Sequence, residues 1–378
     1  MKICIVGGGP AGLYFAILMK RLDASHDIVI FERDGPDDTF GWGIVFSDQT
    51  FGYLESSDAP SFTRIIETCQ TWNNVDIVHR GEKVTIRGNR FSGIARLAFL
   101  NILHRRCHEL GVDIRFRTNI TNRAQLPEHD LFVGADGANS VTRQWFSDVL
   151  APSVDQRKNK YLWLGTPQLF HGLTLTFHQT DKGTFVAHAY KFSENMSTFI
   201  VECGEETWAR AGLEGKSDDE TCAYLQDIFA EDLAGRPLLT NNFVRWINFP
   251  LVRNRHWQSG NVVLLGDALH TAHFSIGSGT KLALEDAIAL AQAFEHNDGV
   301  EAVLPTFEQA RKPVVDQLQD AAQSSLTWFE QMDDYMDLQP IFLAYEAMTR
   351  SGRVSREKLR LRDPEFVAAC ERGSLERG

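Results

Sequence analysis

Long apolar runs, paired cysteines and an excess of basic residues are all missing from this chain of 378 residues. Its 38 Lys and Arg residues face 50 Asp and Glu residues, and the net charge of −12 argues against a nucleic-acid partner, because binding phosphates requires a broad basic face. No apolar run reaches the roughly 20 residues of a membrane-spanning helix, and Met1–Val6 is too short for the apolar region of a signal peptide. We expect a cytoplasmic protein without a membrane or nucleic-acid partner.

The six cysteines are scattered and form no CxxC spacing. Cys4 lies in an apolar strand pattern and Cys107 in a helical one, which predicts buried thiols. This usage is typical of a reducing compartment. The content of 43% hydrophobic and 23% charged residues is ordinary for a globular protein, and the length allows two cooperating subdomains.

A glycine motif follows the first predicted strand, at residues 2–6. The segment reads Gly7-Gly8-Gly9-Pro10-Ala11-Gly12 and leads into a helix predicted for 10–22. Gly7 permits the tight turn, Gly9 lets the backbone approach a pyrophosphate, and Gly12 lets the helix pack on the strand. The helix N-terminus then faces the phosphates with its positive end. This spacing predicts a dinucleotide-binding βαβ unit with Pro10 and Ala11 in the phosphate turn.

An acidic residue ends the second predicted strand, at 27–32. Glu32 lies 20 residues after Gly12, where a carboxylate can accept hydrogen bonds from a ribose hydroxyl. An acid here repels a 2′-phosphate, so the resident dinucleotide is FAD or NAD. We assign Glu32 and its neighbour Arg33 to cofactor binding.

The remaining elements follow from apolar spacing and turn residues. These patterns predict loops and short strands over 35–90, a helix over 94–110, and strands at 112–116 and 131–133. An antiparallel sheet with one solvated face is predicted over 160–203, followed by a helix at about 217–234. The last part is predicted to hold a strand at 262–265, a helix at 279–296, one or two helices over 301–332, and a solvated helix from 351. The predicted cofactor domain is therefore discontinuous, because the chain leaves it, forms the sheet and returns to it. Its parts are 1–75, 94–155 and 256–332, with substrate-domain parts 76–93 and 156–255 and a helical tail at 333–378.

Two later segments narrow the choice of dinucleotide. They are Gly134-Ala135-Asp136-Gly137 with the residues up to Arg143, and Gly266-Asp267-Ala268-Leu269-His270 followed by Gly277-Ser278-Gly279-Thr280-Lys281. Together with the first motif, they resemble the three motifs of the single-component aromatic flavoprotein monooxygenases of the para-hydroxybenzoate hydroxylase type. The resemblance implies an α/β fold: a Rossmann-like FAD-binding domain with an inserted mixed or antiparallel β-sheet substrate domain and C-terminal helices.

Four further segments resemble the subgroup that acts on aromatic coenzyme A thioesters such as salicylyl-CoA and 2-aminobenzoyl-CoA. They read GWGIVFSD at 41–48, YLWLGT at 161–166, STFIVE at 197–202 and HTAHFS at 270–275. Phe274 stands where many relatives have a proline. The resemblance implies hydroxylation of salicylyl-CoA to gentisyl-CoA, with NADH or NADPH reducing FAD and dioxygen forming a flavin C4a-hydroperoxide.

The resemblance also implies roles for individual residues. Asp267 would hold a ribityl hydroxyl, and Gly277, Gly279 and Thr280 would place a helix N-terminus at the flavin N1–C2=O edge. The remaining cofactor contacts would be Arg96 and Asp136, the candidate catalytic residues are His270 and His273, and the candidate substrate contacts are Trp163, His188 and Phe274, with Phe177 and Tyr190 as further choices.

Structural alternatives stand beside these roles. Asp267 could cap a helix, Arg143 could pair with Asp136, and Arg96 could form a surface ion pair. Lys281 could be solvated, and His188 could be a structural histidine with its hydrogen bonds satisfied and not a base. The basic cluster Arg157, Lys158 and Lys160 could bind the phosphates of coenzyme A or be a solvated turn.

Three other functions are compatible with the motifs. A similar hydroxylase of violacein biosynthesis points to a tryptophan-derived bis-indole as substrate. A non-oxygenating FAD reductase is less suited to the aromatic-rich sheet, and a binding-only module would yield a colourless protein. The halogenase motif WxWxIP is absent. We expect no metal site, a small-molecule aromatic thioester as partner, and a monomer or homodimer.

Overall fold

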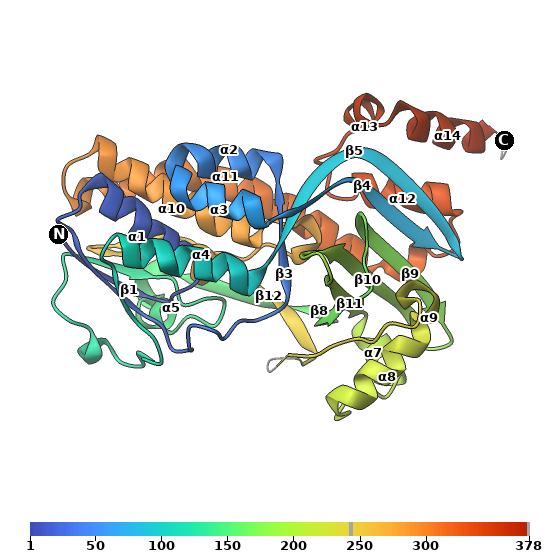
Figure 1. Ribbon diagram of the computed structural model, residues 1–378, viewed down its shortest axis with the longest axis horizontal. Coiled ribbons are helices and arrows are strands. Elements are labelled where there is room, and N and C mark those ends of the chain that lie inside the picture. Colours follow the sequence, from blue (N-terminus) through green and yellow to red (C-terminus); the bar gives the residue numbers. More distant parts are fainter. Residues whose placement is uncertain (242–244, 376–378) are drawn as a thin grey trace.

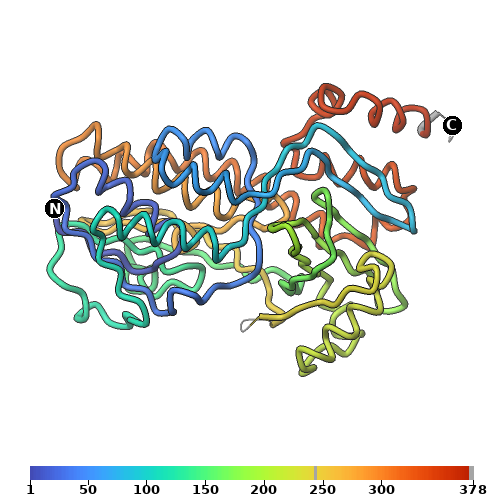
Figure 2. Tube along the Cα trace, in the orientation of Figure 1, coloured from blue at the N-terminus to red at the C-terminus, as the bar shows by residue number. Residues whose placement is uncertain are grey.

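The computed structural model describes residues 1–241 and 245–375, which form two lobes, each built on one β-sheet (Figures 1 and 2). The first sheet has the strand order β13-β14-β7-β1-β2-β6. Its strands are β1 Lys2–Val6, β2 Asp27–Phe31, β6 Asp113–Arg115, β7 Leu131–Gly134, β13 Gln258–Ser259 and β14 Val262–Leu264. All pairings except β13–β14 are parallel, as expected for a doubly wound nucleotide-binding sheet.

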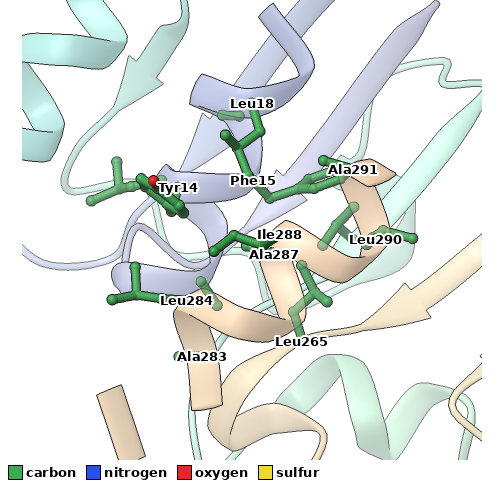
Figure 3. Close-up of a cluster of buried hydrophobic side chains, with 14 of the residues drawn as sticks. Tyr14, Phe15, Leu18, Leu265, Ala283, Leu284, Ala287, Ile288, Leu290 and Ala291 are labelled. Atoms are coloured by element: carbon green, nitrogen blue, oxygen red, sulfur yellow. The ribbon is translucent and has the colours of Figure 1, made fainter. Parts of the chain in front are cut away.

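Helices cover this sheet (Figure 1). They are α1 Pro10–Leu22, α2 Asp48–Ser57, α3 Ala59–Thr68, α4 Arg96–Glu109, α5 Val141–Trp145, α6 Ser147–Leu150, α10 Gly279–His296 and α11 Val300–Glu330. Figure 3 shows the contact between α1 and α10, where Phe15 and Leu18 meet Leu284, Ile288 and Ala291. Alanines on α10 at spacings of four let the two helices approach closely.

The second sheet has the strand order β12-β8-β11-β10-β9-β4-β5-β3 and is antiparallel except between β4 and β9. Its strands are β3 Gly43–Ser47, β4 Gln70–His79, β5 Glu82–Ala95, β8 Pro152–Thr166, β9 Leu173–Thr180, β10 Gly183–Lys191, β11 Ser197–Cys203 and β12 Ile247–Asn254. The predicted fold class, a Rossmann-like domain with an inserted mixed sheet and C-terminal helices, is confirmed. Segments 43–47 and 70–95 both join this sheet.

The remaining α-helices of the described residues belong to the second lobe, three of them between β11 and β12 and three after the last strand. They are α7 Glu205–Arg210, α8 Asp218–Ile228, α9 Ala230–Leu233, α12 Pro340–Thr349, α13 Arg356–Arg362 and α14 Pro364–Leu375. Alternate residues of β8, β10 and β11 point into a core with α8 and α9, so the residues between them face the opposite way. That opposite face carries Tyr161, Trp163, His188, Tyr190 and Glu202.

The prediction of loops and short strands over 35–90 was wrong, since this region holds two helices and the long β4–β5 hairpin. A bulge between Trp72 and Asn74 shifts the register of β4 against β5, and Gly88 has a φ of +72° inside β5. Both interrupt the alternation of apolar and polar residues by which strands are recognised in sequence.

The solvated face predicted for the 160–203 sheet was also wrong for its central strands. Every residue of β11 is buried, as are all residues of β10 except its two ends. The helix predicted from 351 was expected to be solvated, but Leu359, Phe366 and Val367 are buried against the second sheet. The helix predicted for 217–234 is divided at Phe229, whereas the helix at 279–296 is confirmed.

Cys4 and Cys107 are buried free thiols, as predicted. Within residues 1–241 and 245–375, no helix combines the length and the apolar composition that crossing a membrane would require.

Replacing Phe15 with alanine should lower the free energy of unfolding by about 3–5 kcal/mol, because it leaves a cavity between α1 and α10 where Phe15 is fully buried. Urea denaturation followed by circular dichroism measures the change. The control is Leu22→Ala at the end of the same helix, where Leu22 is 40% exposed. Its free energy of unfolding should stay within about 0.5 kcal/mol of that of the parent. Equal losses in both variants would contradict the packing described.

Candidate functional site

The three sequence motifs meet at one edge of the first sheet. β1, β7 and β14 are adjacent and parallel, so the loops that follow them lie side by side. A Cβ placed on Gly7, whose φ is +110°, would lie 2.2 Å from the carbonyl oxygen of Ala135. A Cβ on Gly266 would lie 3.0 Å from the Cβ of Ala11. The turn after β1 therefore contacts both later motifs directly.

The first motif forms the start of α1, with Pro10 at its first turn and Gly9 as N-cap. A Cβ on Gly12 would lie 2.3 Å from the carbonyl oxygen of Gly7, so only glycine lets the helix begin this close to the strand. Above Gly9 there is open space, because a Cβ there would meet no atom within 4 Å. This is room that a phosphate can use against the helix N-terminus.

Glu32 supports the glycine turn directly. Its Oε2 accepts a hydrogen bond from the Gly8 amide at 2.6 Å and its Oε1 from the Asp34 amide at 2.9 Å. Each carboxylate oxygen has a second lone pair for a ribose hydroxyl. Arg33 points to solvent, and its Nε lies 3.4 Å from the Asp34 carboxylate, so its predicted cofactor contact gains no support.

The second motif is held by its own residues. Asp136 accepts hydrogen bonds from the Ser140 hydroxyl and from the amides of Val141 and Thr142, at the start of α5. Arg143 does not pair with Asp136, since its guanidinium donates to the carbonyl oxygens of Ala138 and Ala268 at 2.5 and 2.9 Å. Asp136 thus orders the loop, and Arg143 ties it to the third motif.

A cavity of about 1830 Å³ lies between the two lobes. Eight of the predicted site residues line it, namely Arg96, Trp163, His188, Asp267, Phe274, Gly277, Gly279 and Thr280. The first-motif residues, with Glu32, Arg33 and Asp136, lie outside its wall. The cavity exceeds the roughly 300–1000 Å³ of a site for one drug-sized ligand.

Arg96 and Asp267 meet the requirements for polar contacts to a flavin nucleotide. The Nε of Arg96 is buried without a hydrogen-bond partner among the described residues, and the Asp267 side chain is exposed to the cavity. Loss of bulk water around both groups inside the cavity lowers the pKa of Arg96 and raises that of Asp267. The charge of Asp267 opposes the first shift, and those of His270 and Arg96 oppose the second. Because an orphaned buried donor is costly, a ligand acceptor beside Arg96 is expected. Neither the surface ion pair considered for Arg96 nor a capping bond from Asp267 is present among the described residues.

The start of α10 forms the adjoining wall. Gly279, Thr280 and Lys281 line the cavity with the first turn of this 18-residue helix, whose free amides favour negative charge. Lys281 itself lies 2.7 Å from Glu285 one turn away. The residues present therefore fit a flavin nucleotide, and the amides at the start of α10 would stabilise negative charge on it.

Aromatic side chains form the wall opposite the helix. Phe274 lies with its ring centroid 4.8 Å from Tyr161 and 5.2 Å from His188, and Trp163 continues the wall along β8. Trp163 packs on Gly41, where a Cβ would come within 2.7 Å of the indole, and Trp42 packs on Gly165 in the same way. These two contacts account for Gly41 and Trp42, while a Cβ on Gly43 would lie 2.5 Å from the Cβ of Phe192. Phe177 does not line the cavity and packs against Trp328.

A buried network backs the aromatic wall. His188 lies 3.2 Å from Glu202, whose other oxygen accepts a hydrogen bond from Asn159 at 2.8 Å. Burial alone would raise the pKa of the Glu202 carboxyl, but the hydrogen bond from His188 and the nearby His273 lower it. Glu202 is a residue that the sequence patterns did not single out, although strict alternation puts it on the cavity-side face with His188.

The predicted catalytic contacts of His270 and His273 are not supported, because neither ring lines the large cavity. His270 is buried 2.8 Å from Asp286, which also binds Arg311. His273 lies behind Phe274, with ring centroids 4.1 Å apart, and burial lowers its pKa to about 4. Spacing from Asp267 could not reveal that both rings turn into the core.

The basic cluster Arg157, Lys158 and Lys160 does not line the cavity. Arg157 pairs with Glu330 and Asp155, at 2.6 and 2.7 Å, and Lys160 donates to Asn248 at 2.6 Å. Asp155 and Glu330 neutralise Arg157 alone, since Asn248 carries no charge, and it is the position of the cluster outside the cavity that argues against a role in binding the substrate phosphates.

Comparison with known proteins defines the class. A family model described as FAD binding domain matches residues 1–322, and the chain belongs to this family. It is an FAD-dependent aromatic monooxygenase by class, with FAD as cofactor; NADH or NADPH and dioxygen are typical co-substrates of such enzymes.

Three relatives stand out. The chain is 40% identical to a salicyloyl-CoA 5-hydroxylase of a Streptomyces species, over 97% of this chain and 72% of that protein. It is 37% identical to protodeoxyviolaceinate monooxygenase of Chromobacterium violaceum, over 89% and 91%. It is 35% identical to 3-hydroxy-4-methyl-anthranilyl-[aryl-carrier protein] 5-monooxygenase of Streptosporangium sibiricum, over 94% and 95%. Among solved structures, 2-methyl-3-hydroxypyridine-5-carboxylic acid oxygenase is similar in fold, with a TM-score of 0.72 at 20% identity over 95% of each chain.

Replacing Arg96 with methionine should raise the dissociation constant for FAD on the order of 10- to 100-fold, because a hydrogen bond to a charged group contributes about 1.5–3 kcal/mol. Flavin fluorescence during titration of the apoprotein measures it. The control is Arg105→Met on the same helix, where the side chain is 71% exposed and pairs with Glu109. An unchanged constant for Arg96→Met would remove Arg96 from the cofactor site.

Proposed function

We propose that this chain hydroxylates an aromatic ring carried as a coenzyme A thioester, with conversion of salicylyl-CoA to gentisyl-CoA as the reaction. The observation that carries the proposal is the shared cavity. Its wall joins Asp267 and the start of α10 to an aromatic face of the second sheet, and its volume of about 1830 Å³ leaves room for a long substrate beside the cofactor. The 40% identity to a salicyloyl-CoA 5-hydroxylase supports the same substrate.

FAD, when bound, would supply the redox chemistry, with NADH or NADPH as the reductant and dioxygen as the oxidant. The residues of this chain position and protect the reactants. Tyr161, Trp163 and Phe274 form an aromatic wall that suits an aromatic ring and keeps water away from it. The amides at the start of α10 favour negative charge on the cofactor.

His188 is the cavity residue best placed to accept a proton from a ring hydroxyl. It lines the cavity, and the buried Glu202 holds one of its ring nitrogens at 3.2 Å. A carboxylate in this position orients an imidazole and stabilises its protonated form. Removing the hydroxyl proton makes the ring richer in electrons and more reactive toward an electrophilic oxygen. In this arrangement Glu202 is a positioning residue.

A bis-indole hydroxylase is the second candidate, favoured by 37% identity to protodeoxyviolaceinate monooxygenase over 91% of that protein. The bis-indole substrate lacks the phosphates of coenzyme A, so a comparison of activity on the two substrates distinguishes the two candidate functions.

With purified flavin-containing protein, salicylyl-CoA should stimulate NADH or NADPH oxidation and yield one hydroxylated thioester for each nicotinamide consumed. Absorbance at 340 nm and mass spectrometry of the product measure this. Free salicylate and protodeoxyviolaceinate serve as comparison substrates. Nicotinamide oxidation that yields only hydrogen peroxide with salicylyl-CoA would contradict the proposal, and product from the indole alone would favour the second candidate.

His188→Asn should lower the hydroxylation rate by roughly 100-fold or more near neutral pH, since a positioned base contributes on this scale. Activity should recover as the pH rises and the substrate hydroxyl ionises by itself. His178→Asn is the matched control, because His178 also pairs with a carboxylate, Asp232 at 2.6 Å, but does not line the cavity. A loss that is the same at every pH would show that His188 has only a structural role.

A further inference from the structure

One part of the cavity wall is unrelated to the cofactor motifs. It consists of Gly88, Asn89 and Arg90 from β5 together with Arg353, Lys358 and Arg362 from the C-terminal segment. Figure 1 shows α13 beside β5, in the lobe away from β1. Four basic side chains are gathered on this wall, although the whole chain has a net charge of −12.

Most of these charges are not neutralised. Arg90 lies 3.5 Å from Asp48, whereas Arg353, Lys358 and Arg362 form no ion pair with any residue in 1–241 or 245–375. The other basic residues of α13 behave differently, since Arg356 and Arg360 both bind Glu371 and do not line the cavity. The helix thus has a paired basic side and an unpaired one, and the unpaired side belongs to the cavity.

Contacts with the sheet hold the unpaired side in place. A Cβ on Gly88 would lie 2.7 Å from the carbonyl oxygen of Arg362, so the helix end rests on the strand backbone. The buried Asp363 accepts hydrogen bonds from the amides of Arg87 and Phe366, at 2.7 and 3.0 Å. Arg362 donates to the Asn89 side chain at 3.0 Å, and Leu359 is fully buried. The basic side chains are therefore presented by a fixed support.

The geometry points to a binding site for the phosphorylated adenosine end of a coenzyme A thioester, formed by Arg353, Lys358 and Arg362 with Arg90 beside them. This inference rests on the proposed function. The aromatic acyl group would lie at Tyr161 and Phe274, and the flexible pantetheine arm would run along the cavity between the two ends. Fixed guanidinium and ammonium groups without carboxylate partners are suited to phosphate oxygens.

The test compares the variant Arg353→Gln/Lys358→Gln/Arg362→Gln with the control Arg356→Gln/Arg360→Gln, which removes two charges from the paired side of the same helix. Both are prepared with FAD bound, and the flavin spectrum and circular dichroism establish that they are folded. Adenosine 3′,5′-bisphosphate is titrated into each by calorimetry. We expect each exposed charge to contribute about two- to fivefold, so the triple variant should bind it roughly 8- to 125-fold more weakly than the parent, and the control should match the parent. Absence of binding by the parent, or equal binding by the triple variant, would overturn the inference.

Turnover adds a second, independent readout. The KM for salicylyl-CoA should rise about tenfold in the triple variant, while the KM for the N-acetylcysteamine thioester of salicylate, which has no phosphate, should not change. If neither thioester is hydroxylated, the proposed function fails, yet the calorimetric result still decides the phosphate site. If the parent uses the two thioesters equally well and prefers the acyl group on an acidic carrier protein, the basic wall binds a protein surface and the coenzyme A assignment is overturned.

Discussion

In adjacent parallel strands, the loops that follow the strands begin at the same edge of the sheet, and the site depends on this constraint. The loops after β1, β7 and β14 meet there so closely that no side chain fits between Gly7 and Ala135. The Gly8 amide of the first turn donates to Glu32, and Arg143 joins the second loop to the third. Asp267 and the first turn of α10 continue from this junction into the cavity wall.

The second sheet contributes to the site because one of its faces packs on helices and the other faces the cavity. One face of β8, β10 and β11 packs on α8 and α9, which leaves the alternate residues for the cavity. On that side a buried carboxylate, Glu202, is tolerated because His188 and Asn159 satisfy its oxygens. Tyr161 and Trp163 keep the surroundings apolar. Such a wall combines one oriented imidazole with an aromatic surface, which is what the proposed hydroxylation of an aromatic ring requires.

The C-terminal segment completes the cavity from outside the cofactor fold. Its apolar residues Leu359 and Phe366 attach it to the second sheet, and this attachment orients the charges of Lys358 and Arg362. A local positive wall on an acidic protein can attract an anionic substrate to one place, because screening confines the field of each charge to about 10 Å. The proposed substrate carries its negative charge at one end and its reactive ring at the other.

The local sequence determined the first motif. Gly7, Gly9, Gly12 and Glu32 act within one βαβ unit, so their spacing alone specified the turn. Asp267 and Thr280, which the resemblance of the later motifs singled out, line the cavity. Only the tertiary structure decided the orientation of His270 and His273, the pairing of His188 with Glu202 across two strands, and the position of α13. These depend on contacts between residues far apart in the chain, and in β4 and β5 the bulge and Gly88 removed the periodicity that would have revealed even the strands.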